Sequence, residues 1–135
     1  MRKQGGFTLI ELMIVMTIIA IIAGITIPRV IQSKDTTHET TAQAYLRAIH
    51  QGELIFSTKF GRLATLDELK EEGYLNPAAV YAYWVVLTIT PGGADFTATA
   101  TPAYRATELR HFFVDGTGVV RYTKGAPADI NSTPL

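Results

Sequence analysis

The stretch GGFTLIELMIVMTIIAIIAGITIPRV, residues 5–30, decides the fold of this chain of 135 residues. Within it, the 21 residues from Phe7 to Ile27 comprise 16 apolar residues, three threonines, one glycine and one carboxylate, Glu11. An α-helix of that length spans roughly 31 Å, which is about the thickness of the hydrocarbon layer of a membrane. The sequence therefore predicts one membrane-crossing helix with a charged side chain near its start.

The flanks of this apolar run give its orientation. Arg2 and Lys3 precede the run, whereas the charges that follow it are of mixed sign. The positive-inside rule therefore favours a cytoplasmic N-terminus, with the residues from about 29 onward exported. A secretory signal peptide is the alternative, but its apolar region is shorter and is followed by a small-residue cleavage site, which residues 24–28 do not offer.

The small residues Gly5 and Gly6 lie before the apolar run instead, and this position is part of a family resemblance. The sequence GFTLIE, residues 6–11, after a short basic leader and before an uninterrupted apolar helix, resembles the precursors of type IV pilins and of the related pseudopilins of type II secretion. The later segments LKEEGYLNP and FFVDGTGVVR match this family more loosely. The resemblance implies that a prepilin peptidase cuts between Gly6 and Phe7 and methylates the new amino group of Phe7. It also implies four parts: a cleaved leader (1–6), a transmembrane and filament-core helix (7–27), its amphipathic continuation (28–60) and a globular head (61–135).

Glu11 is costly in a membrane, because a carboxylate in the hydrocarbon region carries a penalty of about 2.5–3.5 kcal/mol at a helix centre. Cleavage before Phe7 would create an amine that is mostly protonated at neutral pH, and methylation keeps that charge. In a bundle of staggered helices, this amine can meet Glu11 of a neighbouring subunit, and the resemblance implies that intersubunit pairing. The alternative is that the Glu11 side chain only reaches back to the cytoplasmic headgroups.

Gly24 and Pro28 form a weak point in the predicted helix. Pro28 has no amide hydrogen to donate to the Gly24 carbonyl, and a helical glycine costs roughly 1 kcal/mol relative to alanine. One interpretation is an ordinary kink. The other, which the resemblance implies, is that the backbone around residues 24–28 unwinds when the filament assembles.

Beyond Pro28 the helix is predicted to continue to about residue 60, since no further proline interrupts it. The polar segment SKDTTHETT, residues 33–41, is compatible with a flexible linker, but we favour helix. Tyr45, Ile49, Gly52 and Phe56 then recur at helical spacing and predict an apolar stripe that packs on a domain.

The remaining residues predict a small antiparallel sheet. Thr65 and Glu68 have the spacing of a capping box and predict a short helix that ends by Gly73. Alternating apolar residues predict strands at 81–90 and 96–100, the second with a solvent-facing row of threonines. Segments 111–114 and 119–122 flank the turn DGTG as a hairpin. The expected fold is α+β and pilin-like: a long N-terminal helix packed on roughly four antiparallel strands.

Composition argues against several classes of function. The 12 basic and 12 acidic residues balance, which gives no sign of a nucleic-acid footprint, and the chain has no cysteine. His38, His50 and His111 are scattered and are expected at the surface. The turn DGTG has one carboxylate, too few for a calcium loop. We therefore expect no enzyme activity, no metal site and no cofactor.

The sequence thus favours a structural subunit of a type IV pilus. By the resemblance, its partners are identical subunits in a helical filament, the prepilin peptidase, an inner-membrane assembly platform with a cytoplasmic ATPase, and membrane lipid before assembly. The expected location is the bacterial inner membrane as a single-pass precursor, and then the cell surface as a filament. A pseudopilin of type II secretion is the nearest alternative, and a membrane-anchored enzyme or binding module is a third.

Overall fold

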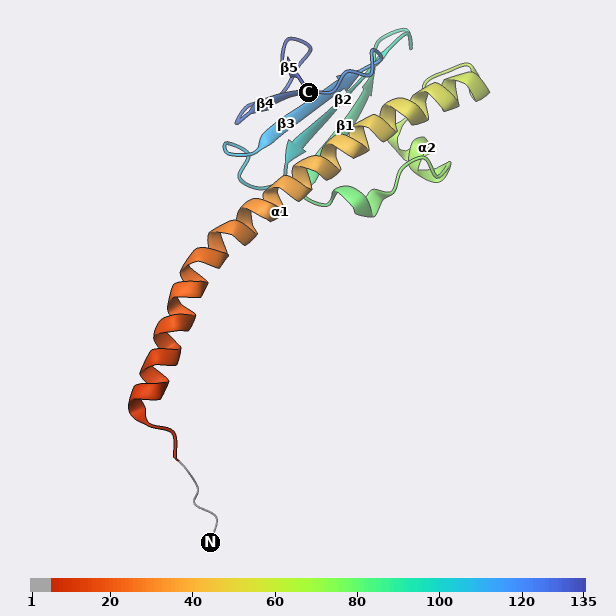
Figure 1. Cartoon of the computed structure of the whole chain (residues 1–135). Coiled ribbons are helices and arrows are strands. Elements are labelled where there is room, and N and C mark those ends of the chain that lie inside the picture. The colour runs from red at the N-terminus through yellow and green to blue at the C-terminus, as the bar shows by residue number, and fades with distance from the viewer. Residues whose placement is uncertain (1–5) are drawn as a thin grey trace. The chain divides into compact units, whose positions relative to one another are not determined.

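The computed structural model describes residues 6–135, so the predictions for Arg2, Lys3 and the leader as far as Gly5 lie outside the described residues. The chain divides between Asp35 and Thr36 into two compact units, which we describe separately. One helix, α1 (Leu9–Phe60), contributes to both units and is 52 residues long. Figure 1 shows α1 and the sheet that accompanies its second half.

Helix α1 is assigned without a break through Pro28 and through residues 33–41, so the helical interpretation of that polar segment is correct and the linker interpretation is not. Gly61 follows the last helical residue with a φ of +71°. Its N–H donates to the Ser57 carbonyl at 2.8 Å, which is typical of a helix end closed by a glycine in the left-handed region. The predicted end of the helix before Gly61 is therefore confirmed.

The sheet is antiparallel, and its strands are neighbours in chain order: β1 (Tyr83–Ile89), β2 (Phe96–Pro102), β3 (Arg110–Asp115), β4 (Arg121–Lys124) and β5 (Thr133–Pro134). The α+β fold, a long helix packed on an antiparallel sheet, is thus confirmed. The sheet has one short strand more than the roughly four expected, because the C-terminal residues pair with β4. Tyr81 lies before β1, next to the 3₁₀ helix η1 (Pro77–Val80), and not in the strand.

The core lies between the second half of α1 and one face of the sheet. In β2, Ala98 and Ala100 are fully buried while Thr97 and Thr99 are half-buried, so the predicted alternation of this strand is confirmed. Cross-strand pairing places Ala98 opposite Val114 and Ala100 opposite Phe112. The small alanines leave room for the larger side chains of α1. The helix buries these apolar residues in the core: Ala42, Tyr45, Leu46, Ile49 and Phe56.

Helix α2 (Leu66–Glu71) lies against α1 at a glycine. A Cβ at Gly52 would lie 3.2 Å from both Leu69 Cδ2 and Tyr74 Cβ, so the two helices approach closely there. The predicted capping box is present, since Thr65 accepts from the Glu68 N–H and the Glu68 side chain accepts from the Thr65 N–H. Gly73 follows α2 with a φ of +81°.

His111 corrects one expectation, that the histidines lie at the surface. It is only 4% exposed, and its Nε2 lies 2.8 Å from the Ala106 carbonyl oxygen. The sequence signal for burial was the position of His111 at the start of the strand FFVD, next to Phe112. His38 and His50 are half-buried.

Candidate assembly site in the N-terminal helix

Glu11 is held by Thr8 at the start of α1. The Thr8 N–H and hydroxyl donate to Glu11 Oε2 at 2.9 and 2.8 Å, and the Glu11 N–H lies 3.3 Å from the Thr8 hydroxyl oxygen. This is the reciprocal pattern of a capping box, with Thr8 before the first helical residue and Glu11 three positions later. Glu11 therefore satisfies backbone and side-chain donors that the helix start would otherwise leave open.

Thr8 is the residue that the sequence analysis missed. Its spacing to Glu11, T-x-x-E, is the same as that of Thr65 to Glu68, which form the capping box of α2. The signal was therefore present in the sequence at both helix starts. Both bonds from Thr8 use Oε2, and among the described residues no hydrogen bond to Glu11 Oε1 occurs. One carboxylate oxygen thus remains available for another donor.

The first half of α1 exposes its apolar side chains in every direction. None of the most apolar 18-residue segment is buried within the chain, and this helix is long and apolar enough to cross a membrane. The threonines do not interrupt this surface, because Thr17 and Thr26 donate their hydroxyls to the carbonyls of Met13 and Ile22, each at 2.8 Å. A hydroxyl paired in this way leaves no open donor in hydrocarbon.

The predicted processing and flexing residues lie along this same helix. Phe7 precedes the capping residue and its side chain is 85% exposed. Gly24 and Pro28 lie one turn apart inside α1, and a Cβ at Gly24 would meet no atom within 4 Å. The structure brings Glu11 together with Thr8, and it keeps the backbone helical across residues 24–28 in this single chain.

Comparison with known proteins agrees with this geometry. The family model described as the prokaryotic N-terminal methylation motif matches residues 1–27. The competence protein ComGC of Bacillus subtilis is 32% identical over 91 residues, which cover 67% of this chain and 93% of that protein. The chain belongs to the type IV pilin and pseudopilin family.

Two further relatives of this pilin-family chain are more similar over shorter stretches. The type IV wide pilus major component PilA4 of Thermus thermophilus is 48% identical over 46 residues, or 34% of this chain and 35% of that protein. The type II secretion system core protein G of Pseudomonas aeruginosa is 42% identical over 48 residues, or 36% and 34% of the two chains. These matches span about a third of each relative. By name, these relatives are components of a pilus and of a secretion system, and neither is named as an enzyme.

The compact unit 36–135 of this pilin-family chain, which comprises the second half of α1 and the head, also contains buried charges that the sequence analysis missed. Glu39 of α1 is 9% exposed and pairs with Arg110 of β3, with Oε2 at 2.7 Å from the guanidinium Nη2. Glu53 of α1 is 1% exposed and accepts the Ala64 N–H at 2.9 Å. Both glutamates lie on the face of α1 that packs on the rest of the head. Glu53 lies four residues after Ile49 and three before Phe56, so its spacing places it on the predicted apolar stripe, although a helical glutamate is ordinarily at the surface.

Proposed function

We propose that this protein is the structural subunit of a type IV pilus, stored in the membrane and polymerised through the first half of α1. The observation that carries the proposal is the apolar helix surface, none of which is covered within the chain over its most apolar segment. Such a surface needs lipid or other apolar helices as its surroundings. A filament supplies the second kind of surroundings once the subunit leaves the membrane.

Proteolytic processing prepares the helix for its transfer from the membrane to the filament. In the proposal, the prepilin peptidase cuts between Gly6 and Phe7 and methylates the Phe7 amine, and residues 7–27 then form the filament core. The new ammonium pairs with Glu11 of an adjacent subunit. The capping box supports this step, because it orients Glu11 through Oε2 and leaves Oε1 without a donor among the described residues.

The remaining steps of filament assembly are proposed to be those of the type IV pilin family. An inner-membrane platform and a cytoplasmic ATPase drive insertion of each subunit, and the filament emerges at the cell surface. On assembly, the backbone between Gly24 and Pro28 unwinds, since Pro28 already deprives the Gly24 carbonyl of its helical donor. Residues 28–60 continue the helix into the head, 61–135.

The test is Glu11→Ala, with assembly and processing measured separately. The variant is expected to insert and to be cleaved, because the helix becomes more apolar and Gly6 is untouched. Surface filaments are expected to be lost, since each incoming chain would bury an unpaired ammonium at a cost of about 3–5 kcal/mol. Glu11→Gln tests whether a hydrogen bond suffices without the charge, and it is expected to be similarly defective.

The measurement is the amount of sheared surface filament relative to the membrane pool, with mass spectrometry of the N-terminus. Gly6→Leu is the control for processing: it is expected to leave an uncut precursor that retains its basic leader. Normal filaments with Glu11→Ala would reject the pairing and leave headgroup contact as the role of Glu11. Assembled material with an N-terminus other than Phe7 would reject the cleavage site.

A second candidate is a pseudopilin, in which the same subunit forms a short filament within a secretion or competence apparatus. The similarity to the secretion core protein G and to ComGC favours it. Deleting the gene distinguishes the two. Loss of surface filaments with normal protein export indicates a pilus, whereas loss of export without loss of long filaments indicates a pseudopilin.

A further inference from the structure

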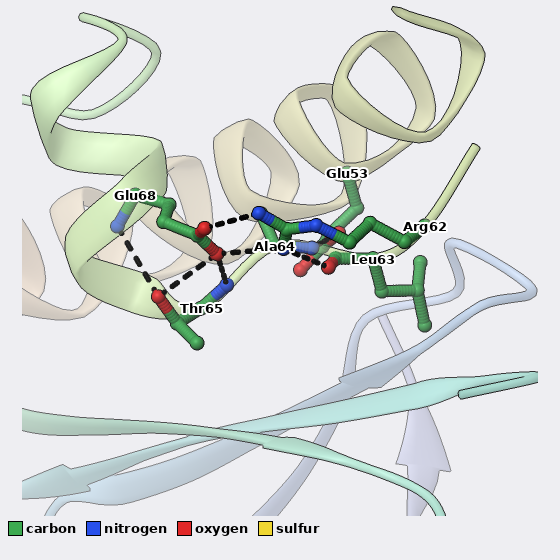
Figure 2. Close-up of polar contacts among 6 residues, drawn as sticks. All are labelled: Glu53, Arg62, Leu63, Ala64, Thr65 and Glu68. Carbon is green, nitrogen blue, oxygen red and sulfur yellow. Dashed lines mark hydrogen bonds and ion pairs between the residues drawn. The ribbon is translucent and has the colours of Figure 1, made fainter. Parts of the chain in front are cut away.

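Glu53 is a buried carboxyl group with a hydrogen bond to only one of its two oxygens among the described residues. It lies about two turns before the end of α1 and is 1% exposed. Its Oε2 accepts the Ala64 N–H at 2.9 Å, as Figure 2 shows, and its Oε1 has no hydrogen-bond partner among the described residues. A buried carboxylate normally has several donors, so a single N–H leaves a negative charge here poorly compensated.

The segment that supplies this N–H is the connection between α1 and α2. It starts at Gly61, whose φ of +71° marks a backbone turn immediately after α1. Arg62 then reaches Glu68 of α2 with two guanidinium nitrogens, and Arg62 Nη1 also donates to the Leu63 carbonyl at 3.1 Å (Figure 2). Residues 62–65 are therefore attached to α2 by surface contacts, to α1 by Glu53 and to the hydrophobic core by the fully buried Ala64.

An open cavity of about 540 Å³ lies beside this connection. Its wall includes Glu53 and Leu54 of α1, Arg62 and Leu63 of the connection, and the turns at 93–96 and 116–117. Glu53 and the connection thus border the same volume, which is large enough to hold water. Displacement of residues 62–65 would take the Ala64 N–H away from Glu53 and let this water reach the carboxyl group.

We propose that residues 62–65 form a pH-dependent latch on α1, closed while Glu53 carries a proton and opened into the adjoining cavity when Glu53 ionises. The protonated carboxyl keeps Oε2 as an acceptor for Ala64 and avoids a buried charge. The ionised carboxylate is better solvated with the latch open. This device belongs to the head and does not depend on the proposed role in a filament.

Several charged groups surround Glu53 and influence its titration. Burial raises the pKa of Glu53, and the nearby Glu68 adds to the increase, while the Ala64 hydrogen bond and Arg62 oppose it. Arg62 and the Thr65 N–H lower the pKa of Glu68 to about 2, so Glu68 stays ionised between about pH 4 and about pH 8. On the cavity side, the turn at 93–96 contributes Asp95, and residues 116–117 carry no charge.

A rise in pH is expected to open the latch, because the pKa of Glu53 is raised in the closed state. Because the pKa is raised in the closed state, closure is fully favoured below the ordinary carboxyl pKa and is lost as the pH rises through the raised value. Between these two values the opening constant is expected to increase about tenfold per pH unit, and above the raised value it is expected to level off.

The experiment is amide hydrogen exchange of the full chain in detergent micelles between about pH 4 and about pH 8, a range that spans ordinary and raised carboxyl pKa values. After correction for the intrinsic exchange rate, protection of the Ala64 amide is expected to fall with pH in the wild type and to be independent of pH in Glu53→Gln. The Tyr74 amide, which donates to the Leu69 carbonyl at 3.0 Å, is the internal control and is expected to stay protected in both. Constant protection of Ala64 in the wild type, or the same pH dependence in the variant, would overturn the proposal.

A second measurement keeps the proposal testable if Glu53→Gln does not fold. The carbon-13 shift of the Glu53 carboxyl carbon is followed through the same pH range in the wild type. Its midpoint is expected above the ordinary glutamate value of about 4.3 and is expected to coincide with the levelling of Ala64 exchange. A midpoint at or below the ordinary value would overturn the latch.

Discussion

At the scale of single residues, an ion pair that is partly removed from water joins α1 to the sheet. Glu39 accepts the backbone N–H of Arg110 at 3.0 Å and the guanidinium Nε at 2.8 Å, which joins α1 to β3. The guanidinium also lies over the Tyr122 ring, 5.3 Å from its centroid. Removing one member of such a pair leaves the other charge buried without compensation, and this usually costs more than the pair itself contributes.

We predict that Glu39→Gln lowers the free energy of unfolding of the head by about 1–3 kcal/mol, below the full cost of breaking a buried pair because Arg110 is partly exposed. The glutamine amide has one acceptor oxygen, and its NH₂ would face the donors of Arg110. Urea unfolding monitored by circular dichroism measures the change. The matched control is Asp67→Asn, which breaks an exposed pair with Lys70 at 3.0 Å and is expected to change the free energy by less than about 0.5 kcal/mol. Equal effects of the two variants would show that burial of Glu39 is unimportant.

At the scale of elements, the two glycines inside α1 have different surroundings. A Cβ at Gly52 would lie 3.2 Å from Leu69 of α2, whereas a Cβ at Gly24 would meet nothing within 4 Å. A side chain at Gly52 would therefore require its neighbours in and after α2 to shift, whereas Gly24 is sterically free to be larger in the single chain. Gly24 lies one turn before Pro28, in the segment where the proposed unwinding would occur.

We predict that substitutions at these two positions differ in their effect on the melting temperature. Gly52→Leu is expected to lower the melting temperature of the head, because a larger side chain must displace α2, at a cost of about 1–3 kcal/mol. Gly24→Ala is expected to leave that melting temperature unchanged and to stabilise the local helix by about 1 kcal/mol. Thermal unfolding measures the effect of Gly52→Leu. Filament yield tests Gly24→Ala, and this yield is expected to fall if residues 24–28 must unwind during assembly. A Gly52→Leu head as stable as wild type would contradict the close approach of the helices.

At the scale of the whole molecule, the compact unit 36–135 contains all of the hydrophobic core, and α1 supplies one side of it. Tyr45, Leu46 and Ile49 are each less than 10% exposed. The unit has no disulfide, so its stability depends on this packing. The sheet without α1 would expose the apolar face of β2 and β3 to water.

We predict that a fragment of residues 36–135 is soluble without detergent and unfolds cooperatively, since it retains the core and lacks the apolar first half of α1. A fragment of residues 61–135 is expected to be unfolded or aggregated, because its sheet has lost the covering helix. Circular dichroism and thermal unfolding of both fragments test this. Matching melting temperatures would show that α1 contributes nothing to the stability of the head.

The sequence by itself determined those elements whose patterns lie within a few neighbouring residues. The apolar run from Phe7 to Ile27, the capping box at Thr65 and the alternation in β2 each follow from side chains a few positions apart, and the structure contains all three. The family motif GFTLIE is equally local. The capping box at Thr8 has an equally local signal, which is the T-x-x-E spacing from Thr8 to Glu11.

Only the tertiary structure decided which polar residues are buried and what they contact. Glu39 lies 71 positions from its partner Arg110, and Glu53 lies 11 positions from Ala64, so neither contact has a helical or strand period that a sequence can show. The burial of His111 and the pairing of β5 with β4 likewise depend on segments brought together by the fold. Helical spacing can place a glutamate such as Glu53 on the buried face, but its partner, its pKa and its energetic role are set by the segment that covers it.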